Sequence, residues 1–182
     1  MTPNWFIGFP MQVEGLSRWP DPPSRVRVFA QEDLHCTVVF LGAVGAKEAQ
    51  RGWSVARDIA FAQVQGGFGE VRALGNPSRP SALSAIVSDG ADELAAMIDR
   101  VRGPIARAAG ARADTRPPLP HMTVARIQRR ATVQDRRAAL AWAQALEVRR
   151  ASFRVTSLGL YTWANDRAQR LFQIVDEHPC QA

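Results

Sequence analysis

The chain has 182 residues, 46% of them hydrophobic, which is the size and composition of one globular domain or of two small lobes sharing a core. It holds no run of about 18 apolar residues and its first ten residues lack a secretion-signal pattern, so the sequence predicts a cytoplasmic protein with no membrane partner. The net charge of +6 favours anionic partners, although 22 of the 23 basic residues are arginine, which is equally typical of a biased base composition.

The first half of the chain predicts three strands followed by a helix. Strands are expected over residues 4–9, 25–30 and 35–42, a short helix or turn over 11–16, a proline-rich loop over 18–24, and a helix over 46–62. The helix is predicted from the spacing of Ala49, Trp53 and Ala56, which places these side chains on one face. Gly66 and Gly67 are expected to break it.

The second half repeats this gross order of elements. Strands are expected over residues 68–74 and 82–87, a helix from 89 to 110, a loop over 112–120, a strand over 120–126, a helix over 132–146, and an antiparallel hairpin of 151–161 with 167–176. Asp89 is expected to cap the first of these helices and the Gly-Pro pair at 103–104 to kink it. Thr132 with Asp135 resembles a capping box at the start of the second.

Two short motifs mirror each other across these halves. His35 and Thr37 open one β-branched run, and His121 and Thr123 open another 86 positions later. Because strand side chains alternate between faces, each histidine shares a face with its threonine. The chain has only three histidines, and two of them hold equivalent places in near-identical strands. We interpret the two motifs as the halves of one duplicated site.

Two imidazoles and two hydroxyls that converge without a carboxylate predict acid–base chemistry at phosphorus. The ordinary pKa of histidine, about 6.5, lets one ring be neutral and the other protonated near neutral pH. The neutral ring can take a proton from an attacking water or hydroxyl, and the protonated ring can give one to the leaving oxygen. Threonine hydroxyls and backbone N–H groups can hold the non-bridging oxygens. This scheme requires no metal.

Other kinds of site fit the sequence less well. The potential zinc ligands His35, His121, His178, Cys36 and Cys180 lack the spacings typical of zinc sites. Strand alternation points Cys36 away from His35, which also disfavours a nucleophilic cysteine. A disulfide is not expected, since one cysteine lies in a strand and the other near the C-terminus. His178 is expected to belong to a solvated tail.

The motifs resemble those of a known family. Residues 35–42 have the pattern H-x-T-x-x-F-L-G and residues 120–126 the pattern P-H-x-T-x-A-R, which are similar to the paired motifs of the 2H phosphoesterase superfamily. Within it the chain most resembles the bacterial and archaeal RNA 2′,3′-cyclic phosphodiesterases, also called the LigT or 2′-5′ RNA ligase family. The strand at 5–9 and the closing strands at 153–163 and 170–175 are also similar, so the resemblance covers nearly the whole chain.

The resemblance implies a single α+β domain over residues 1–182. Two pseudo-symmetric lobes, each an antiparallel sheet with helices on the outside, would form a central groove that holds both motifs. It further implies a monomer that hydrolyses the 2′,3′-cyclic phosphate at an RNA end, or of a small cyclic nucleotide, without a cofactor. The product would carry a 2′-phosphate.

The resemblance also implies a role for each residue of the motifs. His35 would donate the proton to the leaving 3′ oxygen, and His121 would be the proton acceptor that activates water. Thr37 and Thr123 would bind the phosphate oxygens. Arg126 matches the arginine that ends the second motif and would add positive charge at the phosphate.

Two points stay open at this stage. Arg126 lies at an odd offset from the second histidine, so it faces the site only if the strand is twisted or bulged. The aromatic side chain that stacks on a base could be Trp5, Phe6, Phe9 or Tyr161, although an aromatic residue in a strand more often belongs to the core.

Three other functions remain compatible with the same residues. The site could join RNA ends through a 2′-5′ bond without ATP, act on a small cyclic nucleotide derivative, or bind RNA ends without catalysis. Arginines gather around the second motif and either indicate an RNA substrate or form a solvated surface loop: Arg112, Arg116, Arg126, Arg129 and Arg130. Two titrating rings are not needed for binding alone, which disfavours a pure binding module.

Overall fold

The computed structural model describes residues 2–16 and 19–181, so Arg18, which opens the predicted proline-rich loop, lies outside the described residues. The strands are β1 (Trp5–Pro10), β2 (Gln12–Glu14), β3 (Val26–Val28), β4 (His35–Gly42), β5 (Val64–Asn76), β6 (Arg79–Asp89), β7 (His121–Ile127), β8 (Ser152–Val155), β9 (Ser157–Trp163) and β10 (Phe172–Pro179). The helices are α1 (Ala46–Arg57), α2 (Ala91–Ala108) and α3 (Val133–Gln144), with 3₁₀ turns η1 (Gln31–Asp33) and η2 (Val148–Arg150).

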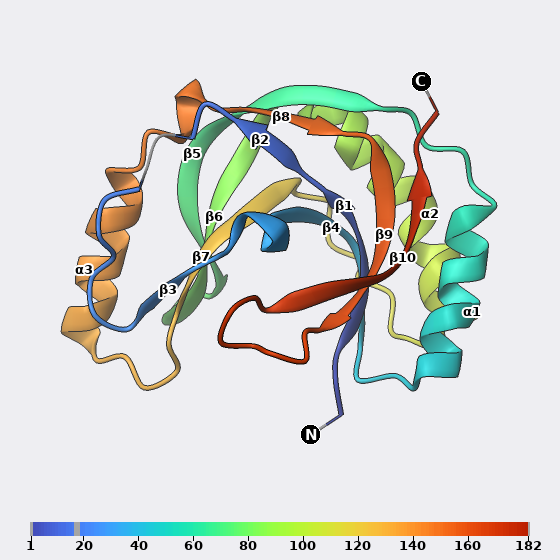
Figure 1. The fold of residues 1–182 in the computed structure, drawn as a ribbon, viewed down its shortest axis with the longest axis horizontal. Helices are drawn as coiled ribbons and strands as arrows, with labels where there is room; N and C mark the ends of the chain where they lie inside the picture. Colours follow the sequence, from blue (N-terminus) through green and yellow to red (C-terminus); the bar gives the residue numbers. More distant parts are fainter. Residues whose placement is uncertain (1, 17–18, 182) are drawn as a thin grey trace.

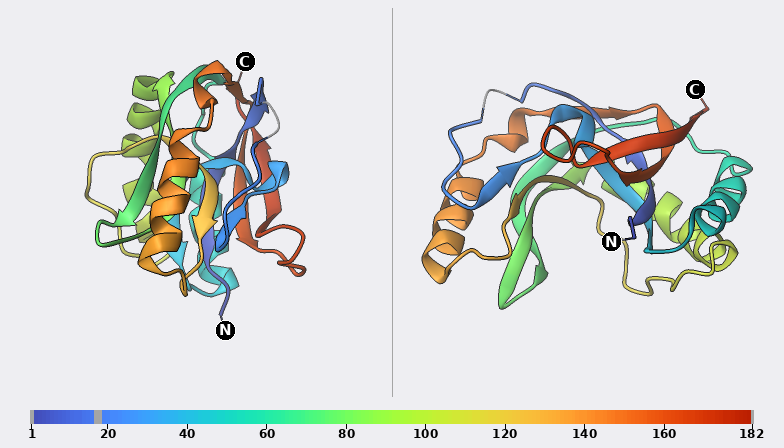
Figure 2. Two further views of the ribbon diagram at one scale, coloured as in Figure 1. Left: turned by 90° about the vertical axis from the view of Figure 1, so that its left-hand side faces the viewer. Right: turned by 60° about the horizontal axis from the view of Figure 1, so that its bottom comes forward.

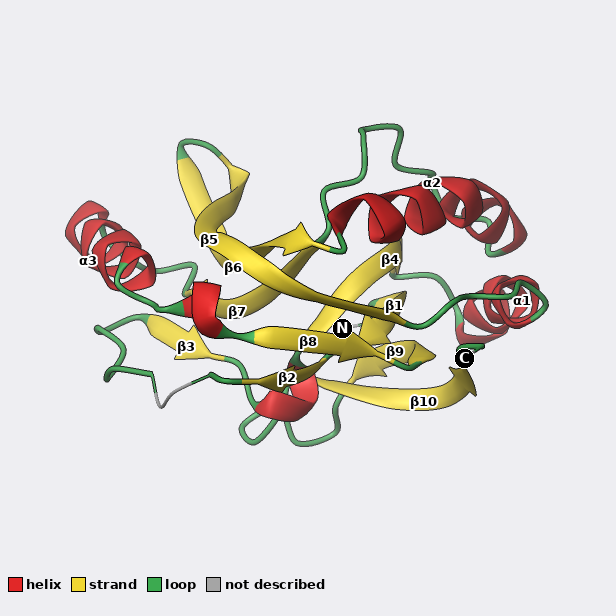
Figure 3. Cartoon of the chain, turned by 90° about the horizontal axis from the view of Figure 1, so that it is seen from above, coloured by secondary structure: helices red, strands yellow, loops and turns green. Residues whose placement is uncertain are grey.

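The strands form one curled sheet with the order β10-β9-β1-β4-β7-β6-β5-β8-β2, and β3 adds to β7 beside this path (Figure 1). Strands β4 and β7 meet near the middle of this order, with the strands of one lobe on one side and those of the other lobe on the other. Helices α1 and α2 lie at one end of the sheet and α3 at the other (Figure 3). The two-lobed α+β fold is thereby confirmed, with the sheets of the two lobes joined edge to edge.

The junction brings the two histidine strands side by side. Strands β4 and β7 are antiparallel neighbours, and Cys36 is the register partner of Met122. Both of these side chains are buried, as are Val38 and Val124 further along the same strands. They belong to one apolar core with the inner face of α2, whose members include Leu94, Ile98, Val101 and Ile105. The apolar residues of both motifs therefore face the helices, which leaves the opposite face of the sheet for the histidines.

The segment 11–16 differs from its prediction. It holds the short strand β2, in which Val13 pairs with Phe153 of β8, rather than a helix or a turn. Three residues are too few to show a period, and the partner strand lies about 140 positions away, so only the assembled sheet determines this conformation.

The first helix ends earlier than its apolar spacing predicts. Helix α1 stops at Arg57, and Gly66 and Gly67 lie inside β5 rather than in a turn. A Cβ atom at Gly66 would clash with the carbonyl of Asp89, because the backbones of β5 and β6 approach closely there. These glycines allow tight strand packing, and the β5–β6 hairpin extends beyond both of its predicted strands.

The start of the second helix also differs. Asp89 is the last residue of β6, and the N-cap of α2 is Gly90 at a φ of 80° with no side-chain cap, so the predicted Asp89 cap is wrong. The helix continues past Pro104 to Ala108, and Gly110 at a φ of 63° follows its end.

The C-terminal third contains one strand more than predicted. The segment 151–161 divides into β8 and β9 at Thr156, since β8 pairs in the second lobe and β9 pairs with β1 in the first. Strand β10 begins later than predicted, so the hairpin turn covers residues 164–171. The capping box of Thr132 and Asp135 at the start of α3 is confirmed. None of the helices in residues 2–16 and 19–181 has the length and apolar character needed to span a membrane.

Candidate active site

The two motif histidines are anchored in the same way. Nδ1 of His35 donates to the carbonyl of Asp33 over 2.7 Å, and Nδ1 of His121 donates to the carbonyl of Leu119, also over 2.7 Å. In both cases the acceptor lies two residues earlier, just before the strand. Because Nδ1 carries the proton in each neutral ring, Nε2 of each ring is the free acceptor. The duplicated motif therefore presents two equivalent nitrogens for proton transfer.

The register of β4 and β7 gathers the four predicted side chains. With Cys36 opposite Met122 in an antiparallel pair, His35 stands opposite Thr123 and Thr37 opposite His121. Directly opposed residues have Cβ atoms about 4.5–5.5 Å apart. Two imidazoles and two hydroxyls are thus expected from the register to form a compact, pseudo-twofold cluster on one face of the sheet.

Each motif strand carries a bulge at the same place. The register of β4 against β1 slips between Thr37 and Val39, and that of β7 against β6 slips between Thr123 and Ala125. One extra residue on each strand resets the alternation of the side chains that follow. Arg126 therefore lies on the face that carries the second histidine, although it stands an odd number of residues from it.

The equivalent residue of the first motif is Phe40, which lies five positions after His35 just as Arg126 lies five after His121. The Phe40 side chain is 57% exposed. From the residue after each histidine to Phe40 or Arg126, the order of buried and exposed side chains is the same in β4 and β7. The site is consequently asymmetric, because a cation ends one half and an exposed aromatic ring ends the other.

The exposure of the aromatic side chains decides which of them could stack on a base. Phe6, Phe9 and Tyr161 are at most 4% exposed, so their rings are not available to a base, and Trp5 is only half-buried but packs against the core. Phe40 was not among the predicted stacking residues, although its place equivalent to the arginine of the second motif was a signal that could have identified it.

An aromatic cluster encloses His35. The Phe6 ring stacks on it at a centroid distance of 4.7 Å, Tyr161 lies at 5.2 Å, and Phe172 meets it edge-on at 5.4 Å. His35 is only 8% exposed. Loss of hydration in this cluster lowers the pKa of His35 to about 4, and the positive charges of His121 and Arg126 act in the same direction. The ring is therefore neutral at pH 7 in the free protein.

Two further features fix the position of His35. The buried carboxylate of Asp33 accepts hydrogen bonds from the backbone N–H groups of Leu171 and Phe172 at 2.8–3.0 Å, which ties the β9–β10 hairpin to the turn before the histidine. Gly8 on β1 allows the two strands to approach closely here, since a Cβ atom there would lie 2.9 Å from the carbonyl oxygen of Cys36 and 3.5 Å from Cδ2 of the His35 ring. Neither role was predicted, because Gly8 comes from a paired strand and the groups that bind the Asp33 carboxylate lie 138 positions or more along the chain.

The second half of the site is more open and differently supported. Burial lowers the pKa of His121, which is half-buried. Thr123 pairs with Ser84 of β6, and their hydroxyls are 3.1 Å apart. Thr37 instead has Gly8 as its register partner on β1, so no side chain from that position competes for its hydroxyl. Ser84 is fully buried, so it can orient the hydroxyl of Thr123 without being reached by solvent, and the sequence alone did not reveal this contact.

The remaining candidates from the sequence lie elsewhere or have other partners. His178 is half-buried in β10 opposite Leu158 rather than in a solvated tail, and its position six residues along the strand from Phe172 corresponds to about 20 Å. Arg116 forms a two-point pair with Asp114 in the loop before β7, which favours a structural role for this arginine. Within the described residues, no three His, Cys, Asp or Glu side chains converge as metal ligands would.

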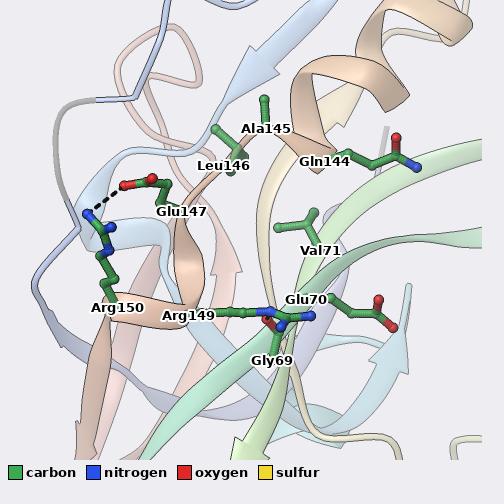
Figure 4. A pocket seen from close by; sticks show the side chains of 9 residues that line it. All are labelled: Gly69, Glu70, Val71, Gln144, Ala145, Leu146, Glu147, Arg149 and Arg150. Carbon is green, nitrogen blue, oxygen red and sulfur yellow. Dashed lines mark hydrogen bonds and ion pairs between the residues drawn. The ribbon is translucent and has the colours of Figure 1, made fainter.

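A hollow of about 480 Å³ lies away from the histidines. It is formed between β5 and the end of α3 and is lined by no residue of β4 or β7 (Figure 4). Two of its charged side chains have partners already, because Arg149 donates to the carbonyl of Gly69 at 2.8 Å and Arg150 pairs with Glu147 at 3.1 Å. Its two acidic side chains, Glu70 and Glu147, are each paired with an arginine.

Comparison with known proteins identifies the architecture. No protein-family model matches the chain, and no curated protein matches it significantly. Among solved structures, E. coli LigT complexed with 3′-AMP superposes with a TM-score of 0.67 at 18% identity, covering 98% of both chains. The protein has the LigT-like fold.

Two further solved structures share the LigT-like fold. A protein named only as a phosphoesterase gives a TM-score of 0.68 at 19% identity over the full length of both chains. The TT0787 protein of Thermus thermophilus gives 0.65 at 13% identity over 97% of both chains. At these identities the likeness establishes the fold that the paired motifs predicted, and the chemistry has to be argued from the site itself.

Proposed function

We propose that the protein is a 2H phosphoesterase that hydrolyses the 2′,3′-cyclic phosphate at the end of an RNA to a 2′-phosphate. One observation carries the proposal: two histidines, held alike through Nδ1, stand diagonally across the β4–β7 pair with a threonine opposite each, and no group of the described residues forms a hydrogen bond to Nε2 of either ring. A site that only binds a phosphate needs cations and hydroxyls, whereas two matched proton-transfer groups suit in-line displacement.

The reaction follows from where the two nitrogens stand. A phosphate held by the hydroxyls of Thr37 and Thr123 places its phosphorus between the rings. Nε2 of His121 takes a proton from water as the water oxygen bonds to phosphorus. The bond from phosphorus to the 3′ oxygen breaks, and Nε2 of His35 gives that oxygen a proton. The products are a 2′-phosphate and a 3′-hydroxyl, with one proton gained by His121 and one given up by His35.

This assignment requires the substrate to change the protonation of His35. With a pKa of about 4 the ring is neutral before binding, so it cannot yet act as the acid. The phosphate brings a negative charge next to Nε2, which favours the protonated ring and raises the pKa in the complex. The bulge in β7 places the Arg126 side chain on the same face as the histidines. Its guanidinium would bind the phosphate directly.

The asymmetry of the site gives the substrate a direction. Phe40 ends the first half with an exposed ring, and base–aromatic stacking contributes about 1–3 kcal/mol per base. We place the terminal base over Phe40 and the phosphate toward Arg126. Structures of E. coli LigT complexed with 3′-AMP and with ATP, which share this fold, show that such a scaffold accommodates nucleotides.

An oligoribonucleotide with a 2′,3′-cyclic phosphate end tests the proposal. The wild-type protein should convert the end to a 2′-phosphate at the same rate with and without EDTA. A cyclic end left intact would contradict the proposal, and loss of activity in EDTA would contradict the metal-free mechanism. Adding an RNA with a 5′-hydroxyl end distinguishes ligation, which would yield a longer product with a 2′-5′ bond in place of the 2′-phosphate.

A further inference from the structure

A second group of positive charges adjoins the site beyond Arg126. Arg27 of β3 is the register partner of Arg126 on β7, so the two side chains project from the same face of the sheet. The guanidinium of Arg27 donates to the backbone carbonyls of Arg167 and Ala168, the second at 3.3 Å. The turn of the β9–β10 hairpin is thereby held beside β3, near the position of Arg126 (Figure 2).

Arg167 at the tip of this turn has a defined orientation. Its guanidinium carbon lies 4.5 Å from the centroid of the Trp163 ring, in the geometry of a cation–π contact. Arg27 links the two arginines, because it is the register partner of Arg126 and donates to the backbone carbonyl of Arg167. In keeping with this arrangement, loss of hydration and the positive charge of Arg167 lower the pKa of Arg126. Among the described residues, no carboxylate forms an ion pair with either of them.

The turn that carries Arg167 is firmly attached. Asp166 uses its carboxylate to accept from the backbone N–H of Ala168 at 2.9 Å, so this nearby acid is engaged within the turn. The N–H of Ala164 donates to the carbonyl of Leu171 at 3.0 Å, and Asp33 holds the end of the turn next to the site histidine. A like-charged pair kept together without an acid is costly to the free protein and favours an anionic ligand.

We propose that Arg167 binds a second phosphate, the one that joins the terminal nucleotide to the nucleotide before it. The inference rests on the proposed function and extends it, because it makes an RNA chain, rather than a cyclic mononucleotide, the preferred substrate. Arg126 would hold the reacting cyclic phosphate and Arg167 the next phosphodiester. Arg27 acts through the turn, since its guanidinium is occupied by carbonyl groups.

Two substrates distinguish binding of the second phosphate from binding of the first. Adenosine 2′,3′-cyclic phosphate has only the reacting phosphate, whereas the adenylyl dinucleotide with the same cyclic end also has a phosphodiester. The measured quantity is the ratio of kcat/KM for the dinucleotide to that for the mononucleotide. A charge-assisted contact at an exposed site corresponds to roughly a tenfold preference. Arg167→Ala should remove most of this preference, and its kcat/KM for the dinucleotide should depend less steeply on salt, by about 0.7 in the log–log slope.

Arg170→Ala is the matched control. Arg170 is an exposed arginine in the same turn, and within the described residues its guanidinium forms no cation–π contact with Trp163. Its replacement removes the same charge and should leave the ratio unchanged. Thermal unfolding of both variants checks that the turn is intact.

The outcomes separate the two claims. Cleavage of both substrates with equal kcat/KM, or an unchanged ratio in Arg167→Ala, would overturn the role of Arg167 and leave the proposed function standing. An equal loss of the ratio in Arg170→Ala would also overturn it, because the effect would then be one of general charge. If the wild type cleaves neither substrate, the proposed function fails and the inference fails with it.

Discussion

Replacing His35 with asparagine tests how strongly the aromatic cluster acts on this ring. The Asn side chain can still donate a hydrogen bond toward the carbonyl of Asp33 but does not titrate. In the wild type, burial among Phe6, Tyr161 and Phe172 lowers the pKa of His35 from 6.5 to about 4. The variant therefore removes one titration from the folded protein while keeping the local hydrogen bond.

The sign and size of the effect follow from linkage. The unfolded chain binds a proton on His35 below pH 6.5, whereas the folded protein binds it only below about pH 4. Between these values the unfolded state holds more protons, so the free energy of unfolding of the wild type falls as the pH falls. A shift of about 2.5 units at 1.36 kcal/mol each makes this contribution about 3 kcal/mol when the pH reaches 4.

Urea unfolding from pH 7.5 to pH 4 measures this contribution directly. The free energy of unfolding of the wild type minus that of His35→Asn should stay constant above pH 7 and decline below it, by about 1.4 kcal/mol at pH 5.5. The acids and His121 titrate in both proteins and largely cancel in the difference. A difference that does not change with pH would refute the account of a desolvated ring, as would an NMR titration of His35 with a midpoint near 6.5.

Three further substitutions test other parts of the site. Phe40→Ala should raise KM for nucleotide substrates about tenfold, with little change in unfolding free energy because the ring is exposed; an unchanged KM would exclude base stacking at this position. Ser84→Ala should lower kcat roughly three- to tenfold while KM is maintained, because one hydrogen bond orients the hydroxyl of Thr123; steady-state kinetics would contradict this if KM alone changed. Tyr161→Phe removes a buried hydroxyl that has no hydrogen-bond partner in the described residues, so it should raise the free energy of unfolding by about 1 kcal/mol and keep activity; thermal or urea unfolding that shows destabilisation would indicate a partner for the hydroxyl.

The sequence predicted those parts of the site that depend on local periodicity. His35 and Thr37 share a face because strand side chains alternate over two residues, and the same holds for His121 and Thr123. Their equivalence in the two halves led to the expectation of one shared site, and the structure places their strands β4 and β7 next to each other. The capping box at the start of α3 was equally local, since its partners lie three residues apart.

Features that depend on distant partners were not predictable in this way. A bulge is a property of two strands, so the slips after Thr37 and Thr123 arise only when β1 and β6 are paired. For that reason Phe40 was overlooked and buried rings such as Phe6 were considered instead. Ser84 comes from a strand 39 positions before its partner, with no motif of its own.

The division of the C-terminal segment shows the same limit. Residues 151–161 hold mostly apolar side chains and no proline, which is compatible with a single strand. The chain nevertheless crosses from one lobe to the other at Thr156, because β8 pairs with strands of the second lobe and β9 lies between β10 and β1 in the first. Which sheet a strand joins is set by the assembled fold rather than by its own composition.

The central claim is that His35 and His121 form one acid–base pair, and single-turnover cleavage of an RNA 2′,3′-cyclic phosphate end tests it most directly. The rates to compare are those of the wild type, His35→Ala, His121→Ala and the double variant. The account predicts that each single substitution lowers the rate about 10²- to 10⁴-fold. The double variant should be little slower than either single variant, because the two rings act as a unit. A single variant that cleaves at the wild-type rate would contradict the paired mechanism.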